Sequence, residues 1–274
     1  MVAALLPLVV VLASCTTPIV GNTPLGSQQV GDGAIAPYDL DLYAEVLSTY
    51  VDEAGWVDYQ GLQANRTGLD QFNASLNAVS PETYADWDEA AQIAFLVNAY
   101  NSLTLQSIID EELLKSSIRD IPGVWRVRRH AILGDTLTLD AIEHDILRKD
   151  FNEPRIHAAL VCAARSCPPL RPEPYTGESL DQQLDDQVGT WLASDVGLVI
   201  DPDNGTVSVS AIFDWFGDDW TTTYSPESGF TGSEVQKAVL NFISGYLDPE
   251  AAAYLQQGDY QLTYLDYDWS LNQQ

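Results

Sequence analysis

The chain is poor in basic side chains. Its 274 residues include 12 Lys and Arg against 40 Asp and Glu, so the formal net charge is −28 at pH 7. Such an acidic surface repels the phosphates of nucleic acids and anionic lipid headgroups. We therefore expect no nucleic-acid partner. We interpret the acidity as an adaptation of solubility to salty or variable surroundings, where dissolved ions screen the repulsion.

Several catalytic signatures are absent as well. The chain has no glycine-rich phosphate loop, no dinucleotide-binding fingerprint and no G-x-S-x-G around a serine. Its cysteines also lack the C-x2-C spacing expected of a zinc knuckle. We therefore expect no cofactor and no metal, and the sequence argues against a serine hydrolase.

Long apolar runs are missing beyond the N-terminus. Residues 2–13 are apolar but too few to span a bilayer as a mature helix, so they are typical of a signal peptide. The run ends in Leu-Ala-Ser-Cys15, which resembles the bacterial lipobox, and no Lys or Arg precedes it. The sequence thus predicts a lipoprotein signal peptide over residues 1–15, with Cys15 as the lipidated residue. A flexible polar tether is expected over residues 16–36.

This N-terminus also predicts where the protein works. A lipid on Cys15 would make the membrane a partner, and Thr16 differs from the Asp that typically retains lipoproteins at the inner membrane. We expect a protein of the cell envelope: either an outer-membrane lipoprotein facing the periplasm, or an exported and membrane-anchored protein.

The few basic residues are concentrated in one part of the chain. Ten of the 12 lie between positions 115 and 171, together with all three histidines and both cysteines beyond the N-terminus. This basic island has two interpretations. It forms a counter-charged pocket for an anionic group, or it pairs with neighbouring acids.

Residues 37–274 contain the patterns of both helices and strands. Periodicity and capping motifs predict helices near 42–51, 62–76, 140–149 and 180–192, and helix starts at Ser80, Asp86 and Ser233. Residues 90–109 are apolar nearly all round, which predicts a central buried helix. Hairpins are expected over 125–139 and 197–210, and a strand within 260–269. The chain shows no repeat and no internal linker, so we expect a single α+β domain whose central helix packs on a small, largely antiparallel sheet.

Residues 156–170 are the most distinctive stretch. They begin as a continuous apolar run, which suits a strand buried on both faces, and Pro168-Pro169 then prevents further pairing. Three roles are open for Cys162 and Cys167: a disulfide, a nucleophilic thiolate activated by Arg165 or a histidine, and a metal site.

The histidines and two asparagines are the other candidate site residues. His144 lies on a predicted helix and suits the role of base for a thiol. Its neighbour Glu143 should point about 100° away on an α-helix and orient some other group. His157 is expected in the core and His130 in solvent. Asn98 and Asn101 share a helix face, where they either hydrogen-bond backbone or face a pocket.

Three blocks of sequence resemble the domain of unknown function 547 family. They are Phe95-Leu-Val-Asn-Ala-Tyr-Asn-Ser-Leu-Thr104, Leu139-Asp-Ala-Ile-Glu-His-Asp-Ile-Leu-Arg148 and His157-Ala-Ala-Leu-Val-Cys-Ala-Ala-Arg-Ser-Cys-Pro-Pro-Leu170. Ile212–Trp220 and the closing Asp-Trp-Ser-Leu271 are similar to its later segments, so the family core would cover about 90–220. The resemblance implies a bacterial or plant family without a settled activity, with a fold only loosely like papain and transglutaminases. Some relatives carry Ser at the position of Cys167, which makes Cys162 the better candidate nucleophile.

Two functions follow from these residues. The first is a thiol-dependent hydrolase or acyl or peptidyl transferase acting on an amide or thioester with an anionic end, hence a small anionic or peptide-like ligand. Cys162 would attack, His144 would take its proton, and Asn98 or Asn101 would orient it or stabilise the oxyanion. Arg165 would bind the anionic group, with His157 and Cys167 as further ligand contacts. The alternative is a non-catalytic binding module of the envelope with a Cys162–Cys167 disulfide.

Overall fold

The computed structural model describes residues 29–30, 34–35 and 38–274. The predicted signal peptide and its Cys15 lie outside these ranges. Within the predicted tether, strand β1 (Gln29–Val30) pairs antiparallel with β2 (Ala34–Ile35). The rest of the tether up to residue 36 lies outside the described residues.

Four short helices open the domain. They are α1 (Leu40–Tyr50), α2 (Tyr59–Ala64), α3 (Thr67–Leu76) and α4 (Pro81–Ala85). The predicted helix 62–76 is divided between α2 and α3 because Asn65 leaves the helical conformation, with φ −128° and ψ 44°. The Ser80 hydroxyl accepts a hydrogen bond from the Thr83 N–H, so the predicted start of α4 is confirmed.

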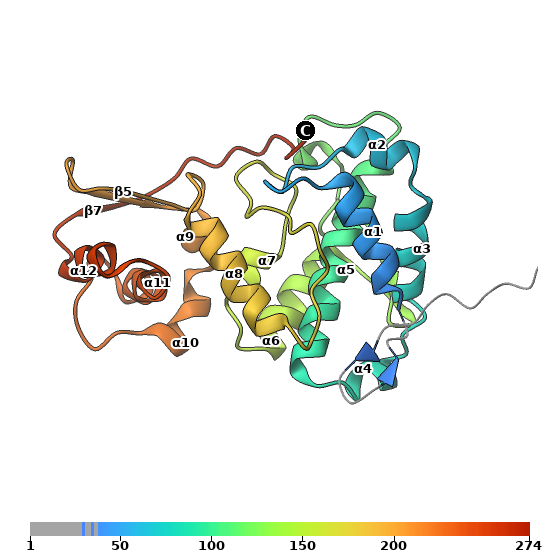
Figure 1. Ribbon diagram of the computed structural model, residues 1–274, viewed down its shortest axis with the longest axis horizontal. Helices are drawn as coiled ribbons and strands as arrows, with labels where there is room; N and C mark the ends of the chain where they lie inside the picture. Colours follow the sequence, from blue (N-terminus) through green and yellow to red (C-terminus); the bar gives the residue numbers. More distant parts are fainter. Residues whose placement is uncertain (1–28, 31–33, 36–37) are drawn as a thin grey trace, which may run out of the picture.

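Helix α5 (Glu89–Ile109) is the centre of the larger hydrophobic core. It begins where the Asp88 carboxylate accepts a hydrogen bond from the Ala91 N–H, and nearly all of its side chains are buried, as predicted. Its main neighbours are α2, α3, α8 and η2, and the three-stranded sheet lies at the other end of the molecule (Figure 1). In the part of the chain that the structure describes, no helix is both long and apolar enough to cross a membrane.

The middle of the chain carries short elements. They are η1 (Ile118–Asp120), the hairpin β3 (His130–Ile132) and β4 (Asp135–Leu137), the π-helix η2 (Ala141–Leu147), α6 (Arg148–Asp150) and α7 (Ile156–Ala159). The predicted strand from residue 156 is wrong, because Ile156–Ala159 form a helical turn that the Leu160 N–H closes on the Ile156 carbonyl at 2.8 Å. A short apolar run fits a buried helical turn as well as a strand, and among the described residues no strand pairs with Ile156–Ala159.

The C-terminal part combines helices with the three-stranded sheet. Its elements are α8 (Leu180–Leu192), β5 (Leu198–Asp201), β6 (Thr206–Val209), α9 (Ile212–Phe216), η3 (Gly217–Trp220), α10 (Thr221–Tyr224), α11 (Glu234–Ser244), α12 (Pro249–Gln257) and β7 (Gln261–Tyr264). Strand β6 pairs antiparallel with β5 and parallel with β7. The predicted capping box at Ser233 and the α+β class are confirmed.

The last ten residues connect the two ends of the molecule. After β7 the chain runs back over the molecule towards α1 and α2 (Figure 1). On the way Ser270 pairs with Ser117, Leu271 pairs with Ala164, and Gln273 pairs with Val57. The segment is thereby held beside the loop that carries the cysteines.

Candidate functional site

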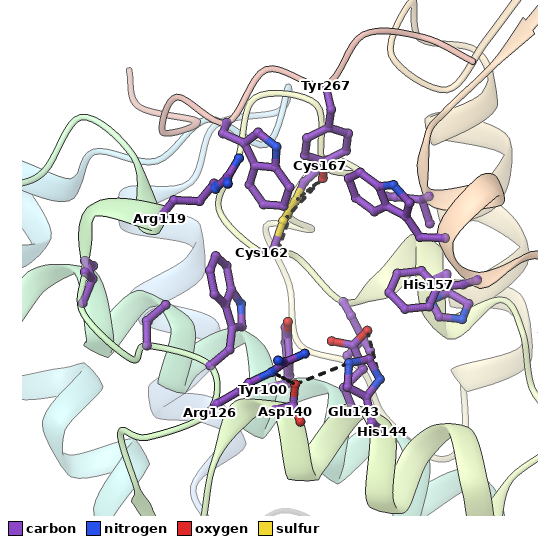
Figure 2. A pocket seen from close by; sticks show the side chains of 18 of the residues that line it. Tyr100, Arg119, Arg126, Asp140, Glu143, His144, His157, Cys162, Cys167 and Tyr267 are labelled. Carbon is purple, nitrogen blue, oxygen red and sulfur yellow. Dashed lines mark hydrogen bonds and ion pairs between the residues drawn. A yellow bond between two sulfur atoms is a disulfide. The ribbon is translucent and has the colours of Figure 1, made fainter. Parts of the chain in front are cut away.

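A cavity of about 500 Å³ opens between the helices around α5 and the C-terminal part. Its wall is built from α5, the loop 119–126, η2, the segment from α7 to Cys167, α9 and the C-terminal segment. Figure 2 shows these side chains converging on one space, with the two cysteines above and the carboxylates Asp140 and Glu143 below. A pocket of this size can enclose most of a small organic ligand.

Aromatic rings make up much of the wall. Trp269 stacks on Trp215 with ring centroids 5.7 Å apart and meets Trp125 edge-on at 6.1 Å. Tyr267 lies 4.7 Å from the Trp269 ring, and Trp215 is 45% exposed. A partly exposed tryptophan at the edge of a ring-lined cavity is a surface that a planar ligand can cover.

Cys162 and Cys167 form a disulfide in the same wall, with their α-carbons 6.3 Å apart. The Tyr267 hydroxyl donates to the Cys167 sulfur at 3.2 Å and lies 3.4 Å from the Cys162 sulfur. Ala163, between them, has a left-handed backbone (φ 62°), which a residue with a β-carbon rarely adopts. A bonded sulfur carries no thiolate, so a nucleophilic role for Cys162 would require reduction.

The floor of the cavity is a π-helix. The Arg148 N–H donates to the Glu143 carbonyl five residues earlier, the hydrogen bond that defines this rare helix. The expectation that Glu143 and His144 must point apart is wrong, because it assumed α-helical geometry, and both side chains line the cavity. π-Helical segments occur frequently at functional sites.

His144 does not pair with Cys162. Its Nδ1 lies 3.0 Å from an Arg148 guanidinium nitrogen, and its Nε2 lies 3.6 Å from the Asp140 carboxylate. Within residues 38–274, no hydrogen bond joins His144 to either sulfur atom. The predicted thiol–imidazole pair is therefore not formed.

His157 has the contacts expected of an oriented imidazole. It is buried, as predicted, and its Nε2 lies 2.8 Å from the Asp219 carboxylate, while its ring stacks on Phe216 at 4.6 Å. Burial alone would raise the pKa of Asp219, but hydrogen bonds from His157 and Arg148 hold that pKa well below its usual range. Asp219 therefore stays ionised and fixes the orientation of His157 at the cavity wall.

Asn98 and Asn101 have structural contacts. The Asn98 amide donates to the Tyr175 carbonyl and accepts from the Tyr175 N–H, at 2.7 and 2.9 Å. The Asn101 amide bonds the Ala159 carbonyl and the Val161 N–H in the same way, both at 2.9 Å. Neither side chain lines the cavity. Both amide groups are engaged in hydrogen bonds to the backbone, so the predicted role in stabilising an oxyanion has no geometric support.

Arg165 also lies outside the cavity. Its guanidinium stands over the Trp56 ring at 5.0 Å and is exposed to solvent. The arginines that line the cavity are Arg119 and Arg126, two members of the basic island that no motif singled out. The basic island is mainly a set of ion pairs: six of its ten members bind acids, namely Lys115, Arg126, Arg128, Arg148, Arg155 and Arg171.

Two tyrosines, the buried Tyr100 and the half-buried Tyr267, complete the polar lining. Burial, together with the negative charge and hydrogen bond of Glu143, raises the pKa of Tyr100 far above its ordinary value. Burial and the charge of Glu143 likewise raise the pKa of Tyr267. Both phenols therefore stay protonated and act as hydrogen-bond groups. Among the described residues, no cluster of three or more His, Cys, Asp or Glu is arranged to hold a metal ion.

Comparison with known families identifies the segment that carries most of this site. Residues 84–192 match the model of DUF547, a protein family of unknown function. The resemblance read from the three sequence blocks is thus confirmed over α5, η2 and the disulfide loop. The matched region ends before α9, so Trp215, Tyr267 and Trp269 lie outside it. No curated protein and no solved structure matches the chain.

Proposed function

We propose that this protein is a binding module of the cell envelope, which takes up a small ring-bearing ligand with an anionic group. The observation that carries this proposal is a cavity of about 500 Å³ walled by tryptophans, with both cysteine sulfurs bonded to each other. Aromatic walls bind planar or apolar rings, and the few polar groups between them fix the orientation of the ligand.

Arg119 replaces Arg165 as the partner of the anionic group. Its guanidinium carbon stands 5.1 Å over the Trp269 ring, at the edge of the cavity. A ligand stacked on Trp215 and Trp269 would place a carboxylate within reach of Arg119. The location in the envelope, with the membrane as partner through a lipid on Cys15, is part of the same proposal.

A titration tests the binding function. Phenylalanyl-phenylalanine, titrated calorimetrically into the full-length chain, should bind, whereas glycyl-glycine should not. Trp215→Ala should weaken binding about tenfold, because a stacked aromatic contact contributes roughly 1–3 kcal/mol. Trp56→Ala, which changes a tryptophan outside the cavity, is the control. Binding that is absent, or insensitive to Trp215, would contradict the proposal.

A second candidate is a thiol hydrolase or transferase that works when the disulfide is reduced. What favours it is that Cys162 and His157 line one cavity and that Asp219 orients His157. A thiol reductant would supply two electrons to open the disulfide. Cys162 would then attack an amide or thioester carbonyl, with His157 in place of His144 accepting the thiol proton and returning it to the leaving group.

Labelling distinguishes the two candidates. After mild reduction, iodoacetamide should modify Cys162 at a pH well below the free-thiol pKa of about 8.5 if the hydrolase candidate is right. His157→Gln should then shift that reactivity to higher pH, and His144→Gln should shift it less. Ordinary thiol reactivity in every variant would leave the binding module as the function.

A further inference from the structure

Arg119 is a positive charge in the cavity that no ion pair of the described residues neutralises. Of the 12 basic side chains in the sequence, four have no acidic partner within 4.0 Å among the described residues, and of these only Arg119 lines the cavity. The other three are Arg129, Lys149 and Arg165. Arg126, the neighbour of Arg119, is different, because its Nε contacts the Asp140 carboxylate at 3.2 Å. Arg119 is thus free to bind a ligand anion.

Glu143 is a negative charge in the same cavity that has no Lys or Arg of residues 38–274 within 4.0 Å, and the charge of Arg148 acts on it only from farther away. Its side chain is 13% exposed, and its contacts are the Tyr100 hydroxyl and the His144 ring, the latter at 4.0 Å. The arginine nearest in sequence, Arg148, is held by the Asp219 carboxylate at 2.6 Å. A carboxylate this buried is stabilised by a cation or by further hydrogen-bond donors, which a ligand can supply.

These two charged side chains line different sides of the same cavity. Figure 2 shows Arg119 beside the upper edge of the cavity, near the cysteines, and Glu143 on its floor beside Tyr100. The rings of Trp125, Trp215 and Trp269 also line the cavity. The arrangement therefore offers a cation at one side, a carboxylate at the other and flat apolar surfaces as well.

We propose that the ligand is an aromatic zwitterion of the size of a dipeptide, with its carboxylate on Arg119 and its ammonium group on Glu143. The proposal rests on the binding function proposed above and specifies its ligand. A purely anionic ligand would be repelled by the net charge of −28. A purely cationic ligand would be repelled by the guanidinium of Arg119 in the cavity. A ligand that carries both charges avoids both penalties, and a cavity of about 500 Å³ has room for two aromatic residues.

Four forms of one dipeptide test the ligand class. Phenylalanyl-phenylalanine, its N-acetyl form, its C-terminal amide and the doubly blocked form are each titrated into the full-length chain by calorimetry. The free dipeptide should bind most tightly. Blocking the amine should weaken binding about three- to tenfold, because it removes a charge-assisted contact to the mostly buried Glu143. Blocking the carboxylate should weaken binding about two- to fivefold, because Arg119 is exposed and solvent screens its charge.

Two variants assign the ends of the ligand. Arg119→Gln should make the free dipeptide and its C-terminal amide bind equally, while the cost of N-acetylation persists. Glu143→Gln should abolish the cost of N-acetylation and leave the cost of amidation. Arg129→Gln and Glu112→Gln change exposed side chains outside the cavity and serve as matched controls.

The outcomes separate this inference from the binding function. If the doubly blocked form binds as tightly as the free dipeptide, the cavity binds aromatic ligands but the zwitterion proposal is wrong. If none of the four forms binds, the binding function itself fails. If blocking weakens binding but neither variant changes the pattern, the charges act elsewhere and the assignment to Arg119 and Glu143 is overturned.

Discussion

Asp219 connects both histidines of the cavity. It binds His157 directly, and it binds the guanidinium of Arg148, which in turn contacts the His144 ring. The pair it forms with Arg148 is mostly buried, with 22% and 24% of the side chains exposed. The Asp219 carboxylate therefore positions His157 directly and His144 through Arg148.

Removing that charge should destabilise the fold. Asp219→Asn leaves Arg148 partly buried without its counter-charge, so the free energy of unfolding at pH 7 should fall by about 2–3 kcal/mol. Because the folded-state pKa of Asp219 is lowered, its contribution is present above the unfolded pKa of about 3.9 and lost as the pH falls through the folded value. Denaturant titrations at several pH values should show the wild-type advantage shrinking only below about pH 4. Asp218→Asn, at an exposed neighbour, should show no such loss.

The stability of the fold should also depend on pH through a basic side chain, His130. The expectation that it faces solvent is wrong: it is buried in β3, where burial and then the nearby Arg128 lower its pKa to about 4. The unfolded chain takes up a proton near pH 6.5 that the folded chain binds only near pH 4, so stability should fall as the pH decreases across this window.

Replacing His130 should remove that slope. His130→Gln should flatten the dependence of unfolding free energy on pH between about 6.5 and 4, where one proton contributes at most about 1.4 kcal/mol per pH unit. Thermal or denaturant unfolding at half-unit pH steps measures it. An unchanged slope in the variant would assign the dependence to other groups.

At the scale of elements, α5 supports the site from behind. Asn101 on this helix binds both the Ala159 carbonyl and the Val161 N–H, so it fixes the chain just before Cys162. The segment has no sheet to satisfy its backbone, and a buried amide supplies the missing partners.

Loss of this amide should be costly. Asn101→Ala would leave a buried carbonyl and a buried N–H without partners, so the free energy of unfolding should fall by about 2–4 kcal/mol. Denaturant titration measures the loss. Asn152→Ala, which removes an exposed hydrogen bond to Thr223, should cost less than about 1 kcal/mol. Equal losses in the two variants would argue against the supporting role of Asn101.

The disulfide loop is the second element with a clear test. The structure predicts no free thiol at Cys162 and Cys167 in the native protein, and two after denaturation with reductant. Because the closed loop is short, reduction should lower the free energy of unfolding by only about 2 kcal/mol, so the reduced protein should stay folded. Thiol titration and denaturant unfolding with and without reductant check both statements. A free thiol in the native protein without reductant would contradict the disulfide and would support a nucleophilic role for Cys162.

At the scale of the whole molecule, the net charge and the charges of the cavity have different consequences. The net charge of −28 is spread over the chain, while the site holds a few unpaired charges between aromatic rings. Most bases of the island between 115 and 171 neutralise local acids. We therefore expect the acidic surface to repel polyanions, and we propose that the interior of the cavity sets which small molecule can bind.

The predicted anchor also concerns the whole molecule. Cys15→Ser should prevent lipidation and release the protein from the membrane fraction into soluble extract. Fractionation with immunodetection measures the distribution, and Ser14→Ala serves as a control that keeps the cysteine. A Cys15→Ser variant that remains in the membrane fraction would show that another anchor is present.

The sequence by itself determined the elements whose signal is local. The capping side chains at Ser80 and Ser233, the apolar surface of residues 90–109 and the amphipathic pattern of 180–192 each specify a helix through contacts within a few residues. The family resemblance of residues 84–192 rests on contiguous motifs as well. The same motifs contain Cys162, Cys167, His144 and His157, which line the cavity.

Only the tertiary structure decided how those residues meet. The π-helical turn that brings Glu143 and His144 to one floor, the helical turn at Ile156, and the backbone contacts of Asn98 and Asn101 depend on neighbours far away in the chain. Tyr267 and Trp269 reach the cavity because the chain end returns from β7 and pairs with residues near positions 57, 117 and 164. Hydrogen bonds and ring contacts between such distant segments leave no periodic trace in the sequence, and in this protein they build the site.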